Sequence, residues 1–246
     1  MRINTNVASL NAREAATNTN NNLQNSLEKL SSGLRINKAS DDASGLAIAD
    51  KLRTQASSIG QSISNGNSAV SLTQIADKAM AEQSNILDIV KTKLIQAATD
   101  TTSEEGRTAI GKDIDKLLTQ LNNISSQTNY NGTTLLESST GTSATALTFQ
   151  MGETSTDIIQ TTAGVKSNVS GLGLEAVKSG AASGGTAASF SAGAARGYMA
   201  TVDTALNTLN GWRADFGSTQ NQLESAVRNQ MTQQTNIKAA ESVIRD

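Results

Sequence analysis

The side chains of this sequence that could do chemistry are mainly carboxylates, and two adjacent pairs stand out, Asp41-Asp42 and Glu104-Glu105. Neighbouring carboxylates can share a proton, as an acid–base pair does, or bind a hard divalent cation. They are also common in the first turn of a helix, where negative charge offsets the positive end of the helix dipole. We interpret both pairs in this second way. Asp113 and Asp115 fall on different sides of a helix, so they do not form a metal site together.

Histidine, cysteine and proline are absent from the 246 residues. The usual protein ligands of zinc, haem and iron–sulfur clusters are therefore missing, together with the usual general base and the Ser–His and Cys–His nucleophile pairs. An enzyme of this composition would depend on carboxylates, lysines and hydroxyl groups. We therefore predict that the chain is not an enzyme and uses no cofactor or metal.

Charge and hydropathy argue against two further kinds of partner. The 20 basic and 22 acidic residues give a formal net charge of −2, which offers no basic surface for nucleic acid. No run approaches 18 consecutive apolar residues, so no segment is predicted to span a membrane. The first residues also lack the apolar run of a cleavable signal peptide.

Hydrophobic spacing predicts the elements that carry these side chains, and the first is a helix in residues 1–41. Its apolar residues recur every three or four positions in two runs, with polar residues between them. They are Ile3, Val7, Leu10, Leu23, Leu27, Leu30 and Leu34. So narrow an apolar face is not stable alone in water, and the helix therefore requires a partner.

Residues 42–137 are predicted to form two bundle helices. The first runs from Asp42 to about Thr99, and the second follows a polar turn and folds back antiparallel on it. Helical spacing resumes in residues 194–246, which are predicted to return beside the first two. The predicted bundle core consists of Ile110, Ile114, Leu117, Leu121, Ile124, Leu223 and Val227.

Residues 138–193 differ in composition, because Gly, Ser, Thr and Ala predominate there. Alternating apolar and polar residues at 146–151, a turn, and a second short segment at 157–161 predict a β-hairpin. Residues 180–191 are predicted to be a flexible loop. The predicted fold is therefore mainly α, a long antiparallel helical bundle or coiled coil with a small β-hairpin region.

Three parts of this sequence resemble bacterial flagellins. Leu27–Asn37 (LEKLSSGLRIN) and Asp41–Ala49 (DDASGLAIA) are similar to the N-terminal signature of that family, and the opening Ile3–Asn6 also matches. Thr128–Gly132 (TNYNG) matches further along the chain. Leu223–Arg245, with AAES near its end, resembles the C-terminal region.

The resemblance implies a structural subunit of the flagellar filament, a helical tube for motility that is secreted and lies outside the cell. Flagellins pair their N- and C-terminal helices in an inner coiled-coil layer, which residues 1–40 match. The implied partners are other copies of the chain, the flagellar export apparatus and the cap proteins. Family sequences continue beyond the position of Asp246 with a further helix, so we expect that this chain does not form an ordinary filament alone.

The resemblance also bears on immune recognition. Many enteric flagellins carry an arginine-centred patch on the long bundle helix, which binds the host Toll-like receptor for flagellin. A gapless alignment places residues 87–93 there, with Ile89 instead of the central arginine and Lys91 beside it. Asp113 replaces a glutamate on the neighbouring helix. Loss of an arginine hot spot typically costs about 2 kcal/mol or more, which implies weak or evaded receptor activation.

Two alternatives to the filament subunit remain open. A hook–filament junction protein shares the Leu-Ser-Ser-Gly signature, although the text of Asp42–Ala49 and the C-terminal match favour flagellin. A coiled-coil adaptor of a regulatory or chaperone-binding class would show the same heptads. It would remain a discrete small oligomer, whereas an intact flagellin would form filaments.

Overall fold

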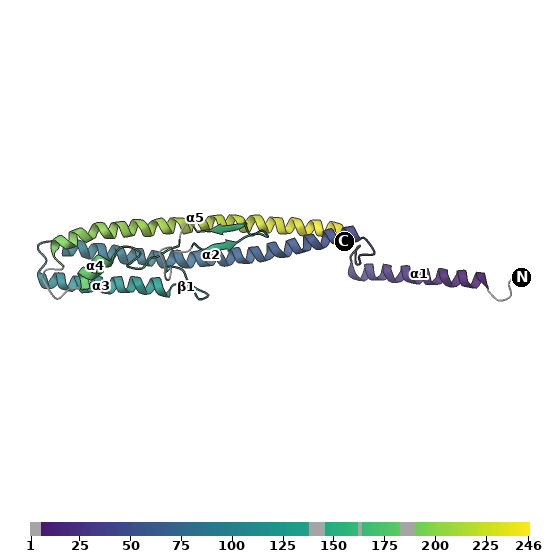
Figure 1. Cartoon of the computed structure of the whole chain (residues 1–246), viewed down its shortest axis with the longest axis horizontal. Coiled ribbons are helices and arrows are strands. Elements are labelled where there is room, and N and C mark those ends of the chain that lie inside the picture. Colours follow the sequence, from purple (N-terminus) through teal and green to yellow (C-terminus); the bar gives the residue numbers. More distant parts are fainter. Residues whose placement is uncertain (1–5, 138–145, 162–163, 183–189) are drawn as a thin grey trace. The chain divides into compact units, whose positions relative to one another are not determined.

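The computed structural model describes residues 6–137, 146–161, 164–182 and 190–246. Helices account for most of these residues, which confirms the predicted mainly-α fold. They are α1 (Val7–Ser32), α2 (Ala43–Ala97), α3 (Glu104–Gln127), α4 (Glu175–Ala182) and α5 (Ala192–Arg245). Four short strands form two antiparallel hairpins, β1 (Asn129–Tyr130) with β2 (Thr133–Thr134), and β3 (Thr148–Gln150) with β4 (Ile158–Gln160). Figure 1 shows these elements along the chain.

The chain divides into two compact units. The first unit comprises residues 1–61 and 229–246, and the second comprises residues 62–228. Both long helices, α2 and α5, contribute residues to each unit. Each unit is therefore described by its own contacts.

In the second unit α3 and α5 both run antiparallel to α2 (Figure 1). Towards the end of α2, Lys93 forms an ion pair with Asp113 near the start of α3, and Gln83 lies opposite Leu121 further along. Residue numbers therefore increase in opposite directions along α2 and α3, as expected for two helices joined by a short connection. The core between the helices is built from fully buried aliphatic side chains, including Met80, Leu87, Leu94, Ile114, Leu118, Leu121 and Leu209.

The β3–β4 hairpin forms at the predicted position and covers a smaller core in the same unit. Phe149 pairs with Ile159 in its register, and Ile159 is buried with Met151 from the adjoining turn. Both pack with Leu223 and Val227 of α5, together with Ala69 of α2. The alternation of apolar and polar residues therefore places one face of the hairpin on the helices.

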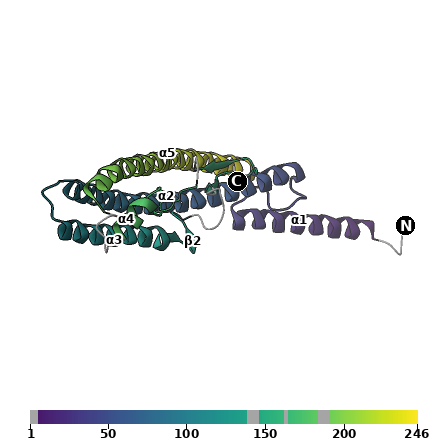
Figure 2. The same cartoon turned by 60° about the vertical axis from the view of Figure 1, so that its left-hand side comes forward.

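The prediction of a loop from residue 180 is wrong at its start, because residues 180–182 end the helix α4. This helix packs on α3 (Figure 2), with Val177, Gly180 and Ala181 buried. Gly111 of α3 permits the approach, because a Cβ there would lie 3.1 Å from the backbone oxygen of Ala181. An eight-residue helix shows too little periodicity to be found by pattern. Residues 183–189 of the predicted loop lie outside the described part of the chain.

Two helix glycines of the second unit should respond to alanine in opposite directions. A Cβ at Gly66 would lie 2.5 Å from Val227 Cγ2 and 2.8 Å from Met151 Cε, whereas one at Gly217 meets nothing within 4 Å. We expect Gly217→Ala to raise the free energy of unfolding by about 1 kcal/mol through helix propensity. Gly66→Ala should lower it, because overpacking costs about 1–3 kcal/mol. Urea denaturation measures both changes, and stabilisation by both variants would contradict the packing at Gly66.

Candidate functional site

Helix α1 carries five exposed apolar side chains in two runs of different helical register, Val7 with Leu10 and then Leu23, Leu27 and Leu30, which we together call the α1 stripe. Each of these side chains is between 44% and 81% exposed, and no residue of α1 is buried. The helix begins where the Asn6 side chain accepts a hydrogen bond from Ser9 N, and it ends at Gly33, whose φ is +70°. Of the other two predicted positions, Ile3 lies outside the described residues. Leu34 follows the glycine that ends the helix, so it does not continue the stripe on α1.

The segment between α1 and α2 caps the end of α5 within the first unit. The backbone N–H groups of Arg35 and Ile36 donate to the carbonyl of Arg245, at 2.8 and 3.2 Å. The Arg35 guanidinium donates to the carbonyl of Ile244 at 2.7 Å. The last carbonyl groups of a helix have no partner inside it and carry the negative end of its dipole, so a cation there is favourable. Sequence reasoning did not identify this role of Arg35.

The two carboxylate pairs have different roles in the structure. Glu104 and Glu105 lie in the first turn of α3, as predicted, behind the N-cap Ser103. Asp42 likewise accepts from backbone N–H groups at the start of α2, those of Ser44 and Gly45. Asp41 differs from the prediction, because its carboxylate binds the loop that precedes it. It accepts from the N–H groups of Asn37 and Lys38, both at 3.1 Å.

The loop contacts of Asp41 predict an acid-sensitive connection between α1 and α2. Backbone hydrogen bonds from Lys38 and Asn37, and then the Lys29 ammonium 3.3 Å away, hold the pKa of Asp41 below its ordinary value. A lowered folded-state pKa stabilises the loop above the unfolded pKa of about 4, and this contribution is lost as pH falls through the folded pKa. We expect the carboxyl carbon signal of Asp41 and the amide signals of Asn37 and Lys38 to titrate together below pH 4 in NMR spectra. In Asp41→Asn these amide signals should no longer move in that range, and an unchanged titration would contradict the contact.

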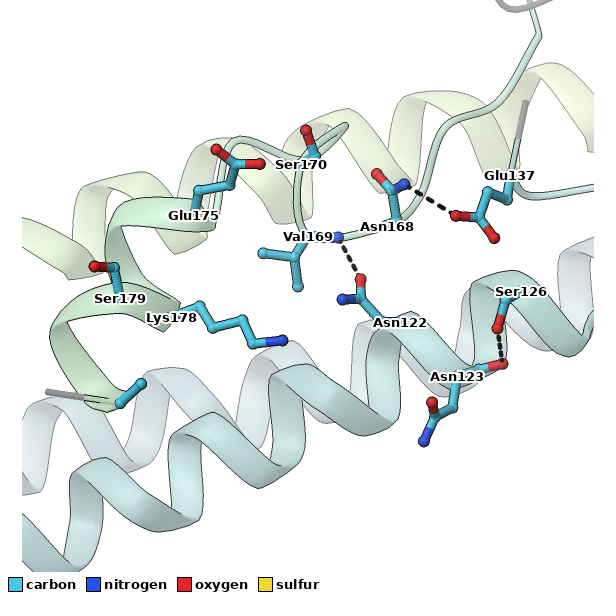
Figure 3. Close-up of a pocket in the computed structure, with 11 residues that line it drawn as sticks. Asn122, Asn123, Ser126, Glu137, Asn168, Val169, Ser170, Glu175, Lys178 and Ser179 are labelled. Carbon is cyan, nitrogen blue, oxygen red and sulfur yellow. Dashed lines mark hydrogen bonds between the residues drawn. The ribbon is translucent and has the colours of Figure 1, made fainter. Parts of the chain in front are cut away.

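A polar cavity lies between α3, α4 and the segment before α4. It has a volume of about 590 Å³, and its lining includes Asn122 and Asn123 of α3, Asn168 and Lys178. In Figure 3 the Asn122 side chain points to the segment before α4, where its oxygen accepts from Val169 N at 2.8 Å. Asn168 in turn accepts from Gly171 N at 2.7 Å. These amides hold the segment on α3, which is a structural role.

The described residues hold no group of three or more His, Cys, Asp or Glu side chains placed to bind a metal ion. No helix in the described part of the chain is both long and apolar enough to cross a membrane. The features that stand out chemically are therefore the exposed α1 stripe and the packed helices of the second unit.

Family models and known proteins match both ends of the chain. The model of the bacterial flagellin N-terminal helical region matches residues 3–141, and that of the flagellin C-terminal helical region matches residues 199–246. The chain belongs to the bacterial flagellin family. It is 34% identical over its whole length to the flagellin of Bacillus subtilis strain 168, of which it covers 87%.

Other flagellins show how much of a longer relative the chain represents. It is 46% identical to flagellin B of Helicobacter pylori strain J99 over 181 residues, 70% of this chain. The match covers 35% of that protein, so the chain spans about a third of this longer flagellin. The crystal structure of Bacillus cereus flagellin aligns with a TM-score of 0.56 at 25% identity, over 72% of this chain and 94% of that one.

A protein described as flagellar hook-associated, from Vibrio parahaemolyticus, shares the fold. Its structure covers 83% of this chain and 99% of its own, with a TM-score of 0.69 and 11% identity. Similarity at that identity is one of fold alone. It does not favour the hook–filament junction protein over the flagellin.

The structure places the residues of the predicted receptor patch on the two helices α2 and α3 of the second unit. Ile89 is 47% exposed on α2. Lys91 forms an ion pair with Asp203 of α5 at 2.5 Å, and Lys93 forms one with Asp113 of α3 at 3.0 Å. Ile89 is therefore followed along α2 by two cations that already have acidic partners.

The predicted bundle core of this flagellin is close to the observed one, with two shifts on α3. Ile110, Ile114, Leu121, Leu223 and Val227 are buried. Leu117 and Ile124 are only half-buried, and their neighbours Leu118 and Ser125 are fully buried instead. The predicted and the observed sets of buried residues on α3 are both spaced by three and four residues, so spacing alone does not distinguish them.

Proposed function

We propose that this chain is a structural subunit of the bacterial flagellar filament, located outside the cell, and that its main partners are other copies of itself. The observation that carries the proposal is the α1 stripe, five apolar side chains on a 26-residue helix that buries none of its residues. A helix of this kind gains little stability from its own backbone, so it requires apolar contact with another helix. Membership of the flagellin family supports the identity of that partner as a neighbouring subunit.

Assembly into a filament follows from the kind of contact that such a stripe makes. Subunits in an open helical polymer meet through two different surfaces, so each copy leaves one surface free for the next. Burial of the stripe contributes roughly 25 cal/mol for each Å² of apolar surface removed from water. The capping of α5 by Arg35 supports this function, because it holds the segment that follows α1 against the end of α5.

Electron microscopy of two forms of the chain tests the proposal. The first form is the chain of residues 1–246. The second extends this chain with the C-terminal helix of a longer flagellin, and we expect it to polymerise into ordered helical tubes. A matched variant of the second form with Leu23→Ser, Leu27→Ser and Leu30→Ser should not polymerise.

Two results would count against the filament subunit. If the extended form is a discrete oligomer of fixed size, the chain is a coiled-coil adaptor. If the variant with three serines forms tubes as readily as the extended form, the α1 stripe is not the assembly surface. Circular dichroism of both forms checks that the serines leave α2, α3 and α5 helical.

Export through the flagellar apparatus and growth under cap proteins are part of the same proposal. A chain without cysteine forms no disulfide on the way out, and one without proline avoids slow peptide-bond isomerisation before assembly.

We also propose weak activation of the host Toll-like receptor for flagellin, because Ile89 stands at the position of the arginine that the receptor binds. In a reporter-cell assay we expect a response at least about 10-fold below that of an enteric flagellin, which corresponds to loss of one hot-spot contact. Ile89→Arg should restore part of the response, and Ile95→Arg on the same helix serves as the control for added charge. An equally strong response from the unaltered chain contradicts the proposal.

A further inference from the structure

The β1–β2 hairpin is closed by an exposed two-residue turn, Asn131-Gly132. Tyr130 pairs with Thr133 across the turn, and Asn129 pairs with Thr134. Asn131 has φ +51° and Gly132 has φ +81°, and both residues are exposed. Positive φ at both central residues is the requirement of the tight hairpin turn for which Asn-Gly is favoured. The same dipeptide is also the one in which an asparagine side chain is least shielded from the next backbone nitrogen, because glycine has no Cβ.

We infer that Asn131 is a modification site, at which the folded chain undergoes spontaneous deamidation. The Gly132 backbone nitrogen loses its proton to solvent base and attacks the side-chain carbonyl carbon of Asn131. A bond forms between this nitrogen and Cγ, the bond from Cγ to the side-chain nitrogen breaks, and ammonia leaves. Water then opens the resulting five-membered imide at either carbonyl, which gives aspartate or isoaspartate. The sum is asparagine plus water to an acid plus ammonia, with no oxidation or reduction.

The chain contains two other Asn-Gly pairs, and the structure separates them from this one. Asn65-Gly66 lies inside α2 and Asn210-Gly211 lies inside α5. In a helix the glycine N–H donates to the carbonyl four residues earlier, so the attacking nitrogen is engaged and the backbone is held away from the imide geometry. Among the described residues the Gly132 N–H has no such partner. Of the three Asn-Gly pairs, the turn alone has, among the residues that the structure describes, a glycine nitrogen that donates no hydrogen bond.

The modification changes the hairpin as well as its charge. Aspartate at 131 tolerates the left-handed backbone, so this product leaves the turn in place and adds one negative charge. Isoaspartate carries the main chain through its side-chain carbon, which lengthens a loop whose register depends on having two residues. The β1–β2 pairing should then be lost, together with the half-buried position of Tyr130 against the main core. The backbone bond from Leu135 N to Thr128 O, 3.1 Å long, lies at the base of the same hairpin.

Peptide mapping by mass spectrometry tests the inference on the full chain, incubated folded at 37 °C and mildly alkaline pH. We expect Asn131 to deamidate at least about tenfold faster than Asn65 and Asn210, because the helical sites must first open. The rate at Asn131 should rise with pH, since the attacking nitrogen must lose a proton. In the chain unfolded in urea the three rates should converge, which shows that structure and not local sequence separates them.

Two variants complete the test. In Asn131→Asp the early release of ammonia during the incubation should be lost, because position 131 no longer has a side-chain amide. Position 131 can then give no isoaspartate by deamidation. Asn210→Asp should leave the early release unchanged. The inference is overturned if the three sites react at equal rates in the folded chain, or if Asn131 stays intact while the helical sites react.

Discussion

Leu118→Ala is expected to lower the free energy of unfolding by about 2–5 kcal/mol, among the largest effects of any single substitution in the chain. The Leu118 side chain is 0% exposed and belongs to the main core of the second unit, with Ile114 and Leu121 one turn away on α3. Truncation removes buried methyl groups from a densely packed site and leaves a cavity that the neighbouring helices fill only in part. Urea denaturation followed by circular dichroism measures the change.

Leu117→Ala is the matched control, because it removes the same atoms one position away on the same helix. Leu117 is half-buried at the edge of this core, so we expect a loss of about 1 kcal/mol or less. Both variants have the same helix propensity, which makes the difference between them a measure of burial alone. An equal or larger loss for Leu117 would falsify the rotation of α3 in this structure.

Which of these two leucines is buried could not be predicted from the sequence. Spacing of three and four residues correctly placed α3 and its antiparallel course on α2, because a helix must bury one face. Leu117 and Leu118 fit that spacing equally well, and the helix that packs on α3 decides which of the two is buried. On α3 that neighbour is α4, which requires the small residue Gly111 on the contact face and so fixes the rotation of the helix.

The β3–β4 hairpin was predictable for the opposite reason. Its signal is local, since an alternating segment, a turn and a second short segment lie within 16 residues of one another. Helix α4 and the capping of α5 by Arg35 were not predictable, because both depend on contacts between segments far apart in the chain. The apolar residues of the α1 stripe were predicted from the sequence to require a partner helix. They are exposed in the single chain.

Buried polar residues were the other feature that pattern did not reveal, and Gln83 is the main example. It lies in a polar stretch of α2 yet is 0% exposed. Its side-chain nitrogen donates to the carbonyl of Leu121 on α3 and to that of Ser167 before α4, both at 3.2 Å. One amide therefore joins three segments of the second unit. A polar residue at such a position specifies an arrangement that apolar packing alone leaves free.

Gln83→Ala is expected to lower the free energy of unfolding by about 2–4 kcal/mol, through a cavity and two lost hydrogen bonds. Gln83→Met keeps the volume and removes only the bonds, so its cost should be about 1 kcal/mol. Both variants release the Ser167 carbonyl, and both should increase hydrogen exchange at the Ser167 N–H, which donates to Leu136 O at 2.9 Å. Ser126→Ala, an exposed substitution on α3, should leave this exchange unchanged.

The free energy of unfolding and the hydrogen exchange at Ser167 together show whether Gln83 only fills space in the core or also holds the segment before α4. If Gln83 only fills space, Gln83→Met restores both stability and slow exchange at Ser167. If Gln83 links α2 to the segment before α4, Gln83→Met restores most of the stability while exchange at Ser167 stays fast. We expect the second result, because the Ser167 carbonyl is buried and loses the side-chain donor that the structure gives it. Slow exchange in Gln83→Met would show that the backbone bonds of Ser167 and the Asn122 contact to Val169 hold this segment by themselves.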